Sequence, residues 1–169
     1  MRHSLRWALV LLTLPTALPA SAQTPTLIST HSDWTVYEVS DSRGKVCYIA
    51  SEPTSQDGNY SRRGNPAALV ARLPGDPPSE QVSVQPGYAY REGSAVDVKI
   101  EGRDFELFTR GEHAWANTDA DDQALIDAMK RGMRMMVRGT STRGTYSLDT
   151  YSLNGFTAAY EAMRGACRS

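Results

Sequence analysis

Side chains that could carry acid–base catalysis are few in this sequence of 169 residues. Histidine exchanges protons most readily near neutral pH, and after the first 22 residues only His31 and His113 are present. A catalytic histidine needs a positioned nucleophile and an orienting acid. The sequence has no G-x-S-x-G motif. We therefore interpret His113 as a solvated loop residue and keep an envelope enzyme that uses His113 and Asp119 as an alternative.

Three aspartates near the middle of the chain offer carboxylate oxygens for calcium. An EF-hand loop needs a glycine at its sixth position and a glutamate at its twelfth, and the residues after Asp119, Asp121 and Asp122 do not fit that pattern. Thr118 followed by Asp121 instead resembles a capping box, with the acids at the positive end of a helix dipole. We interpret the acids as the start of a helix, and no metal site is predicted.

Four methionines could supply the soft thioether ligands that cuprous copper prefers. Met129 and Met133 lie one helical turn apart, whereas Met135 and Met136 are predicted on opposite faces of a strand. Methionine most often fills gaps in a hydrophobic core. Core packing is therefore the favoured interpretation, a soft-metal carrier is kept as an alternative, and no cofactor is predicted.

Arg134, Arg138 and Arg143 follow one another along a predicted hairpin. A row of guanidinium groups could bind an anionic partner or a surface glycan. The same arginines could equally form a solvated face that pairs with Asp149 and Glu161, and we favour this second interpretation. The three residues remain the candidate interaction surface of the sequence.

The two cysteines, Cys47 and Cys167, are 120 residues apart. An even number of cysteines in an exported chain predicts a disulfide. In the chain-entropy model, closing so long a loop stabilises the fold by about 4–5 kcal/mol. Two thiols without a nearby His or Cys partner do not make a zinc site. From the positions of the two cysteines, we predict that the disulfide joins the C-terminal helix to an early strand.

The first 22 residues have the pattern of a signal peptide. Arg2 and Arg6 form a positive start, residues 8–14 are apolar but too short to span a bilayer, and Ala20-Ser21-Ala22 matches a signal-peptidase site. We therefore expect an exported protein, periplasmic or at the cell surface. No later apolar run reaches transmembrane length.

The remaining residues predict one acidic domain. Residues 1–22 hold two of the 18 Lys and Arg and none of the 19 Asp and Glu, so the rest of the chain has a net charge of −3. Nucleic-acid binding needs a strong basic excess and is not expected. Residues 23–32 lack periodicity and are predicted to be a flexible leader, and residues 33–169 form the domain.

The pattern of the domain is mostly that of short strands separated by turns. Residues 137–140 and 145–153 predict a hairpin with its turn at Arg143-Gly144. The spacing of Phe156, Ala159, Tyr160 and Met163 predicts a short helix that ends at Gly165. A second helix follows Thr118 and ends at Gly132. Seven or eight strands with two short helices indicate an antiparallel β-sandwich.

The chain also resembles a known family. The residues that carry the resemblance are Trp34, the strand around Cys47, Arg63 and Pro66, Val82-Ser83-Val84, Gly87-Tyr88, Ala128–Gly132, Gly139–Thr145, Tyr151-Ser152-Leu153, Gly155-Phe156, Ala158-Ala159 and Cys167. Together they are similar to the invasion-associated locus B family of exported Gram-negative proteins. The resemblance implies an immunoglobulin-like sandwich, a periplasmic or surface location and a part in host-cell invasion, and it supplies no catalytic residues. We therefore expect a non-catalytic protein that binds a protein or envelope partner.

Overall fold

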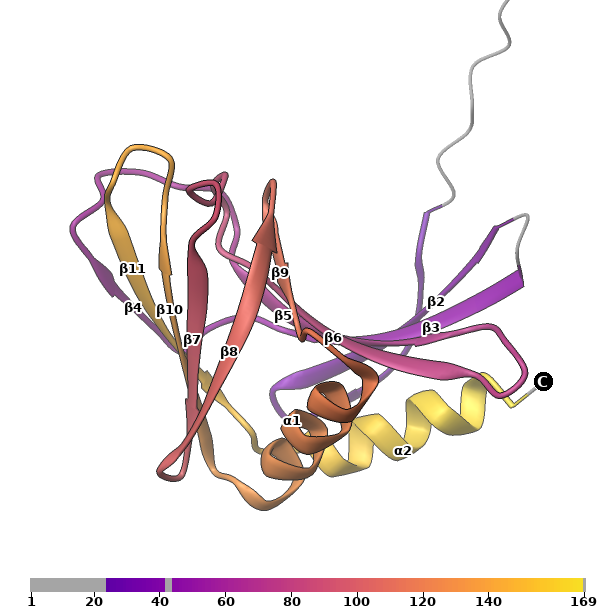
Figure 1. The fold of residues 1–169 in the computed structure, drawn as a ribbon. Coiled ribbons are helices and arrows are strands. Elements are labelled where there is room, and N and C mark those ends of the chain that lie inside the picture. The colour runs from indigo at the N-terminus through magenta and orange to yellow at the C-terminus, as the bar shows by residue number, and fades with distance from the viewer. Residues whose placement is uncertain (1–23, 42–43, 169) are drawn as a thin grey trace, which may run out of the picture.

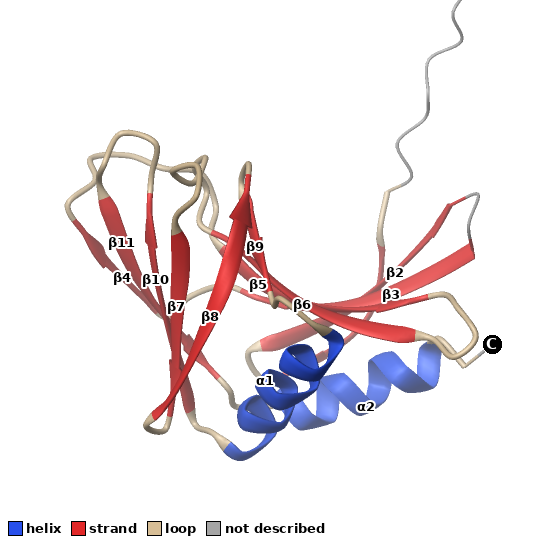
Figure 2. Ribbon diagram, in the orientation of Figure 1, coloured by secondary structure: helices blue, strands red, loops and turns tan. Residues whose placement is uncertain are grey.

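The computed structural model describes residues 24–41 and 44–168, which form eleven strands and two helices (Figures 1 and 2). The strands are β1 (Thr26–His31), β2 (Trp34–Asp41), β3 (Gly44–Ser51), β4 (Ser55–Gly58), β5 (Ala67–Leu73), β6 (Ser79–Gln85), β7 (Ala95–Ile100), β8 (Arg103–Arg110), β9 (His113–Trp115), β10 (Arg134–Thr140) and β11 (Tyr146–Ser152). The helices are α1 (Asp119–Arg131) and α2 (Phe156–Ala166). The predicted signal peptide lies outside the described residues. Neither helix is long and apolar enough to cross a membrane.

The strands belong to one antiparallel sheet in the order β1-β2-β3-β5-β6-β9-β8-β7-β10-β11-β4. β1 and β4 are its edges, so the sheet is not closed. The predicted mostly-β class with two short helices is therefore confirmed. The separation into two immunoglobulin-like sheets is not seen, because β9 pairs with β6 on one side and with β8 on the other and so joins the two halves.

The continuous sheet bends sharply between β8 and β6 (Figure 2). One arm consists of β4, β11, β10, β7 and β8, and the other arm contains β6, β5, β3 and β2. Both helices lie against the second arm. The buried apolar side chains of both arms and both helices form one core cluster. The bend lets one sheet enclose a core in the way that two packed sheets would.

Alternation of apolar and polar residues explains which strands form. In β7, Val96, Val98 and Ile100 are buried, whereas the residues between them are exposed. In β10, Met135 and Val137 are buried in the same way. The predicted hairpin is confirmed as β10 and β11, which pair along their whole length.

Both helices were predicted from their apolar stripes and caps. Thr118 caps α1, because its side chain accepts a hydrogen bond from the Asp121 amide, and Gly132 follows the last residue of the helix. The predicted stripe of α2 is fully buried. Gly165 does not end α2 as predicted, since the helix continues to Ala166 and is capped by Cys167.

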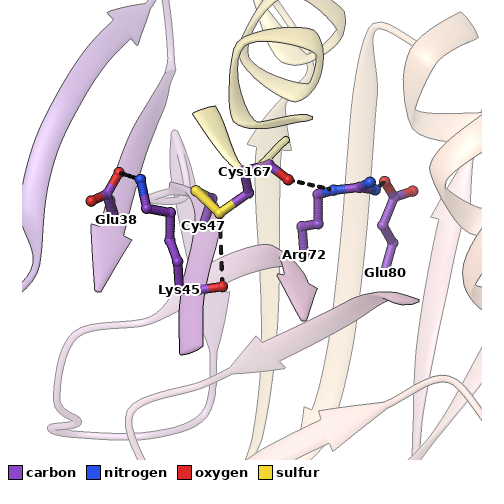
Figure 3. The surroundings of a disulfide bond; sticks show 6 residues. All are labelled: Glu38, Lys45, Cys47, Arg72, Glu80 and Cys167. Carbon is purple, nitrogen blue, oxygen red and sulfur yellow. Dashed lines mark hydrogen bonds and ion pairs between the residues drawn. A yellow bond between two sulfur atoms is a disulfide. The ribbon is translucent and has the colours of Figure 1, made fainter. Parts of the chain in front are cut away.

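The predicted disulfide between Cys47 and Cys167 is present, with 5.9 Å between the two Cα atoms (Figure 3). It joins β3 to the residue that follows α2. Beside it, Arg72 Nε donates to the carbonyl oxygen of Cys167 at 3.4 Å and Arg72 Nη1 donates to Glu80 at 2.8 Å. Glu80 also accepts from the hydroxyl of Tyr160 on α2. The C-terminal helix is thus tied to β3, β5 and β6 by covalent and polar contacts.

The predicted flexible leader, residues 23–32, contains strand β1, whose pairing shifts register between Leu27 and Ser29. β1 pairs with β2 from Thr26↔Glu38 to His31↔Trp34. Its residues show no alternation of buried and exposed side chains, because the strand lies at the sheet edge and is mostly exposed. Edge pairing through the backbone therefore supplies the structure that the side-chain pattern does not indicate.

Candidate functional site

The three arginines of the candidate interaction surface do not lie together. Arg134 and Arg138 are exposed on β10. Arg134 borders a hollow that also contains Glu101, and the Arg138 guanidinium lies over the ring of Tyr146 at 5.1 Å. Arg143 lies in the turn after β10, where it lines a different cleft. Arg134 and Arg138 therefore lie on the strand, away from Arg143 in the turn. Further arginines line only the cleft that contains Arg143.

The predicted pairing of these arginines with Asp149 is wrong. Asp149 is 2% exposed and forms its ion pair with Arg63. It points to the core side of β11, since β11 alternates buried and half-exposed residues and Asp149 occupies a buried position. Glu161 is an exposed residue of α2.

His113 and Asp119 do not form a catalytic pair in the part of the chain that the structure describes. His113 lies on β9, where its ring stacks on Trp115 with 5.4 Å between ring centroids. Asp119 begins α1 and lines a hollow with Arg164. No hydrogen bond between described residues joins the two side chains. The Trp115 ring in turn lies tilted against the ring of Phe108, which is 44% exposed, so this group lies at the surface of the sheet.

The four methionines face different environments. Met129 and Met135 are buried at 1% and 0% exposure, whereas Met133 and Met136 are 77% and 40% exposed. Two of them therefore fill the core as predicted, and the other two lie in solvent. The four thioethers are therefore divided between the core and the surface.

Two of the three aspartates at the start of α1 have separate structural roles. Asp121 accepts a hydrogen bond from the Thr118 hydroxyl at 2.7 Å. Asp122 is 4% exposed and accepts from the Val82 amide at 2.7 Å. Burial, with smaller contributions from Asp119 and Asp121, raises the pKa of Asp122 to about 6. Asp122 thereby satisfies a backbone donor of β6 just before β6 begins to pair with β9 at Ser83.

Three loops that are far apart in the sequence meet at one end of the molecule, in the upper left of Figure 1. We call this region the loop end, and it consists of residues 59–66, 86–94 and 141–145. The Gly64 amide donates to the Gly87 carbonyl at 2.8 Å, and the Thr142 amide donates to the Ala89 carbonyl at 3.0 Å. Gly87 has φ 76°, and a side chain there would overlap the Gly64 backbone. Backbone hydrogen bonds therefore link all three loops.

A buried ion pair between Arg63 and Asp149 holds the loop end to the sheet. Both side chains are 3% exposed. Arg63 Nη1 donates to Asp149 Oδ2 at 2.7 Å and to the Pro86 carbonyl at 3.2 Å, and Nη2 donates to Asp149 Oδ1 and to Gln56. Burial lowers the pKa of Arg63, but the hydrogen bond and charge of Asp149 outweigh that effect and raise it. The pair joins four segments of the chain, which are the loop of Arg63, β11, Pro86 and β4.

Tyrosine side chains surround this pair. The Tyr88 hydroxyl lies 2.7 Å from the hydroxyl of Ser147, and Tyr90 and Tyr151 are buried beside it. Burial raises the pKa of all three phenols. They remain neutral at physiological pH and act as hydrogen-bonding and packing groups rather than as bases.

The loop end contains a cleft of about 490 Å³. We call it the loop-end cleft, and it is lined by Asn59, Tyr60, Ser61, Arg62, Arg63, Gly87, Tyr88, Ala89, Ser141, Thr142, Arg143 and Thr145. Three of these residues are arginines and none is acidic. Arg62 and Arg143 are exposed, whereas Arg63 is buried in its pair with Asp149. The cleft can therefore present to a ligand two guanidinium groups that form no ion pair with any described residue.

The sequence profile of the family described as "Invasion associated locus B (IalB) protein" matches residues 34–164. The chain belongs to this family. A solved structure, invasion associated protein b from Bartonella henselae, has 16% sequence identity and a TM-score of 0.61, and the match covers 85% of this chain and 100% of that one. This likeness shows that the fold is shared. No curated protein matches the chain significantly.

Some of the residues that carry the IalB resemblance line the loop-end cleft. These residues come from three separate motifs of the sequence, and they are Arg63, Gly87, Tyr88, Ser141, Thr142, Arg143 and Thr145. The cleft and the ion pair were not predicted. Arg63 and Asp149 are 86 residues apart, and neither stands in a local pattern that indicates its partner. The accumulation of these motifs in loops was the signal that could have indicated the site.

Proposed function

We propose that this member of the IalB family is an exported, non-catalytic protein that binds a protein or cell-envelope partner at the loop-end cleft. One observation carries the proposal: the cleft combines exposed Arg62 and Arg143 with acid-free walls, on loops that the buried Arg63–Asp149 pair fixes in place. A preorganised cationic cleft loses little entropy when a ligand binds.

The proposed export is supported by the signal-like residues 1–22 and by the disulfide, because disulfides persist mainly in oxidising compartments. We place the protein in the periplasm or at the cell surface. The names of the family and of the Bartonella henselae protein associate them with invasion. We extend a role in host-cell invasion to this chain as part of the proposal.

Site-specific photo-crosslinking in intact cells tests the binding site. A photoreactive amino acid replaces Thr142 in the cleft wall, and in a matched variant it replaces Arg134, which is exposed on the same hairpin but outside the cleft. We expect one identified partner to crosslink at position 142 and to be lost when Arg62→Gln and Arg143→Gln are added. Capture of the same partner with equal yield at position 134 would refute the proposed site.

The non-catalytic part of the proposal has its own test. We expect the purified chain to show no turnover in a broad screen with hydrolase substrates. If turnover is found and is lost in His113→Ala, the enzyme interpretation replaces the binding interpretation.

A further inference from the structure

The charge of the loop-end cleft defines the kind of ligand it fits. Of its three arginines, Arg63 is neutralised by Asp149, and Arg62 and Arg143 remain as two positive charges in acid-free walls. A phosphate monoester carries about −1.5 to −2 charges at pH 7. A single carboxylate would neutralise only one of the two guanidinium groups. The charge of the cleft therefore matches a dianion.

The hydrogen-bond donors around the cleft also match a phosphate group. Arg62 and Arg143 supply exposed guanidinium donors, whereas Arg63 Nε is buried without a partner among the described residues and is not offered to a ligand. Arginine donors suit the several acceptor oxygens of a phosphate group.

The remaining walls of the cleft suit the organic group that carries the phosphate. Tyr60 and Tyr88 are half-exposed, and the guanidinium of Arg63 lies over the Tyr60 ring at 4.6 Å. Ser61, Thr142 and Thr145 add hydroxyl groups. Aromatic rings combined with hydroxyl groups provide one apolar and one hydrogen-bonding wall. A cleft of about 490 Å³ is large enough for a phosphate and one attached sugar-sized group.

We infer that the loop-end cleft of this chain binds a phosphate monoester, with Arg62 and Arg143 contacting the phosphate oxygens. The inference rests on the proposed function, since it names the ligand chemistry of the same cleft. The phosphate can be carried by a soluble sugar phosphate or by a phosphate headgroup in a lipid surface, and these two sources are separated by experiment.

Calorimetric titration of the oxidised full chain tests the inference with glucose 6-phosphate, with glucose, and with phosphatidylcholine vesicles that contain or lack phosphatidic acid. We expect binding of glucose 6-phosphate or of the phosphatidic acid vesicles, and none of glucose or of plain phosphatidylcholine. Whichever of the two is bound identifies the source of the phosphate. Arg62→Gln and Arg143→Gln should each weaken binding roughly tenfold or more, because each removes charge-assisted hydrogen bonds.

Arg134→Gln is the matched control, since Arg134 is exposed on β10 and does not line the cleft. Its affinity should equal that of the unsubstituted chain, and all three variants should have unchanged melting temperatures because the replaced side chains are exposed. Binding of neither phosphate compound, or equal loss in the control, overturns the inference. If crosslinking at position 142 still captures a partner in that case, the proposed function stands with a different ligand chemistry.

Discussion

At the scale of single residues, the Arg63–Asp149 pair organises the site. It is buried, it is bidentate, and its guanidinium also contacts Pro86 and Gln56. A buried pair of this kind contributes little net stability compared with an apolar pair of similar volume, but the removal of one partner leaves an uncompensated charge. We therefore regard the pair as the device that positions the loops rather than as a source of overall stability.

Arg63→Ala should lower the free energy of unfolding by about 3–5 kcal/mol, because Asp149 would remain buried without a cation. Denaturant unfolding measures this loss. The control Arg134→Ala removes an exposed arginine and should change stability by less than about 0.5 kcal/mol. Equal effects of the two substitutions would show that Arg63 does not hold a buried charge in place.

Asp122→Asn should change how stability depends on pH. The pKa of Asp122 is about 6 in the folded chain and 3.8 in its ordinary state. The folded state therefore binds more protons between these values, so the contribution of Asp122 to the free energy of unfolding falls as pH rises from about 4 to about 6. Unfolding of Asp122→Asn should lack this fall, whereas Asp119→Asn should retain it.

An equal or steeper loss of stability over the same pH range in Asp122→Asn than in the unsubstituted chain would contradict this assignment. The substitution keeps an acceptor for the Val82 amide, so a general collapse of the fold is not expected. Asp122→Ala, which leaves that amide unsatisfied, should cost about 1–3 kcal/mol at any pH.

At the scale of elements, the sequence predicts those strands and helices whose buried residues recur with a fixed period. β7, β10 and the two helices were found in this way, and the cap residue Thr118 located the start of α1. β1, β4 and β9 have no such signal, because β1 and β4 are edge strands and β9 has only three residues. Their conformation depends on backbone pairing, and for β4 and β9 this includes strands that are distant in the sequence.

Gly155→Ala should destabilise the junction between β1 and α2 strongly. Gly155 caps α2 with φ 84°, and a side chain there would overlap the carbonyl oxygen of His31. Gly102→Ala is the matched control, since Gly102 has φ 79° and open space around it. The control should cost about 1–2 kcal/mol from backbone strain alone, and Gly155→Ala should cost clearly more in thermal unfolding. Similar costs at the two positions would mean that β1 is not packed against this turn.

At the scale of the whole molecule, one sheet with two arms is held to the C-terminal helix by the disulfide. The class of the fold could be predicted because strand and helix patterns are local. The continuity of the sheet could not, since it depends on β9, whose pairing with β6 and β8 is set by tertiary contacts. The cysteine pair was predictable because the chain has only two cysteines.

The double variant Cys47→Ala, Cys167→Ala should lose about 4–5 kcal/mol of unfolding free energy, because the bridge closes a loop of 120 residues. Denaturant unfolding with and without reductant measures this. The unsubstituted chain should lose stability when reduced, whereas the double variant should be insensitive to reductant. An unsubstituted chain with the same unfolding midpoint in both conditions would contradict a stabilising bridge.

The central claim is that this rigid scaffold binds its ligand at the loop-end cleft. Backbone amide shifts in the nuclear magnetic resonance spectrum of the oxidised chain, recorded while glucose 6-phosphate is added, test it most directly. The account predicts saturable shifts concentrated in residues 59–63, 87–89 and 141–145. Saturable shifts centred on the helices or on the hollow beside Arg134, with the three loops unchanged, would contradict it.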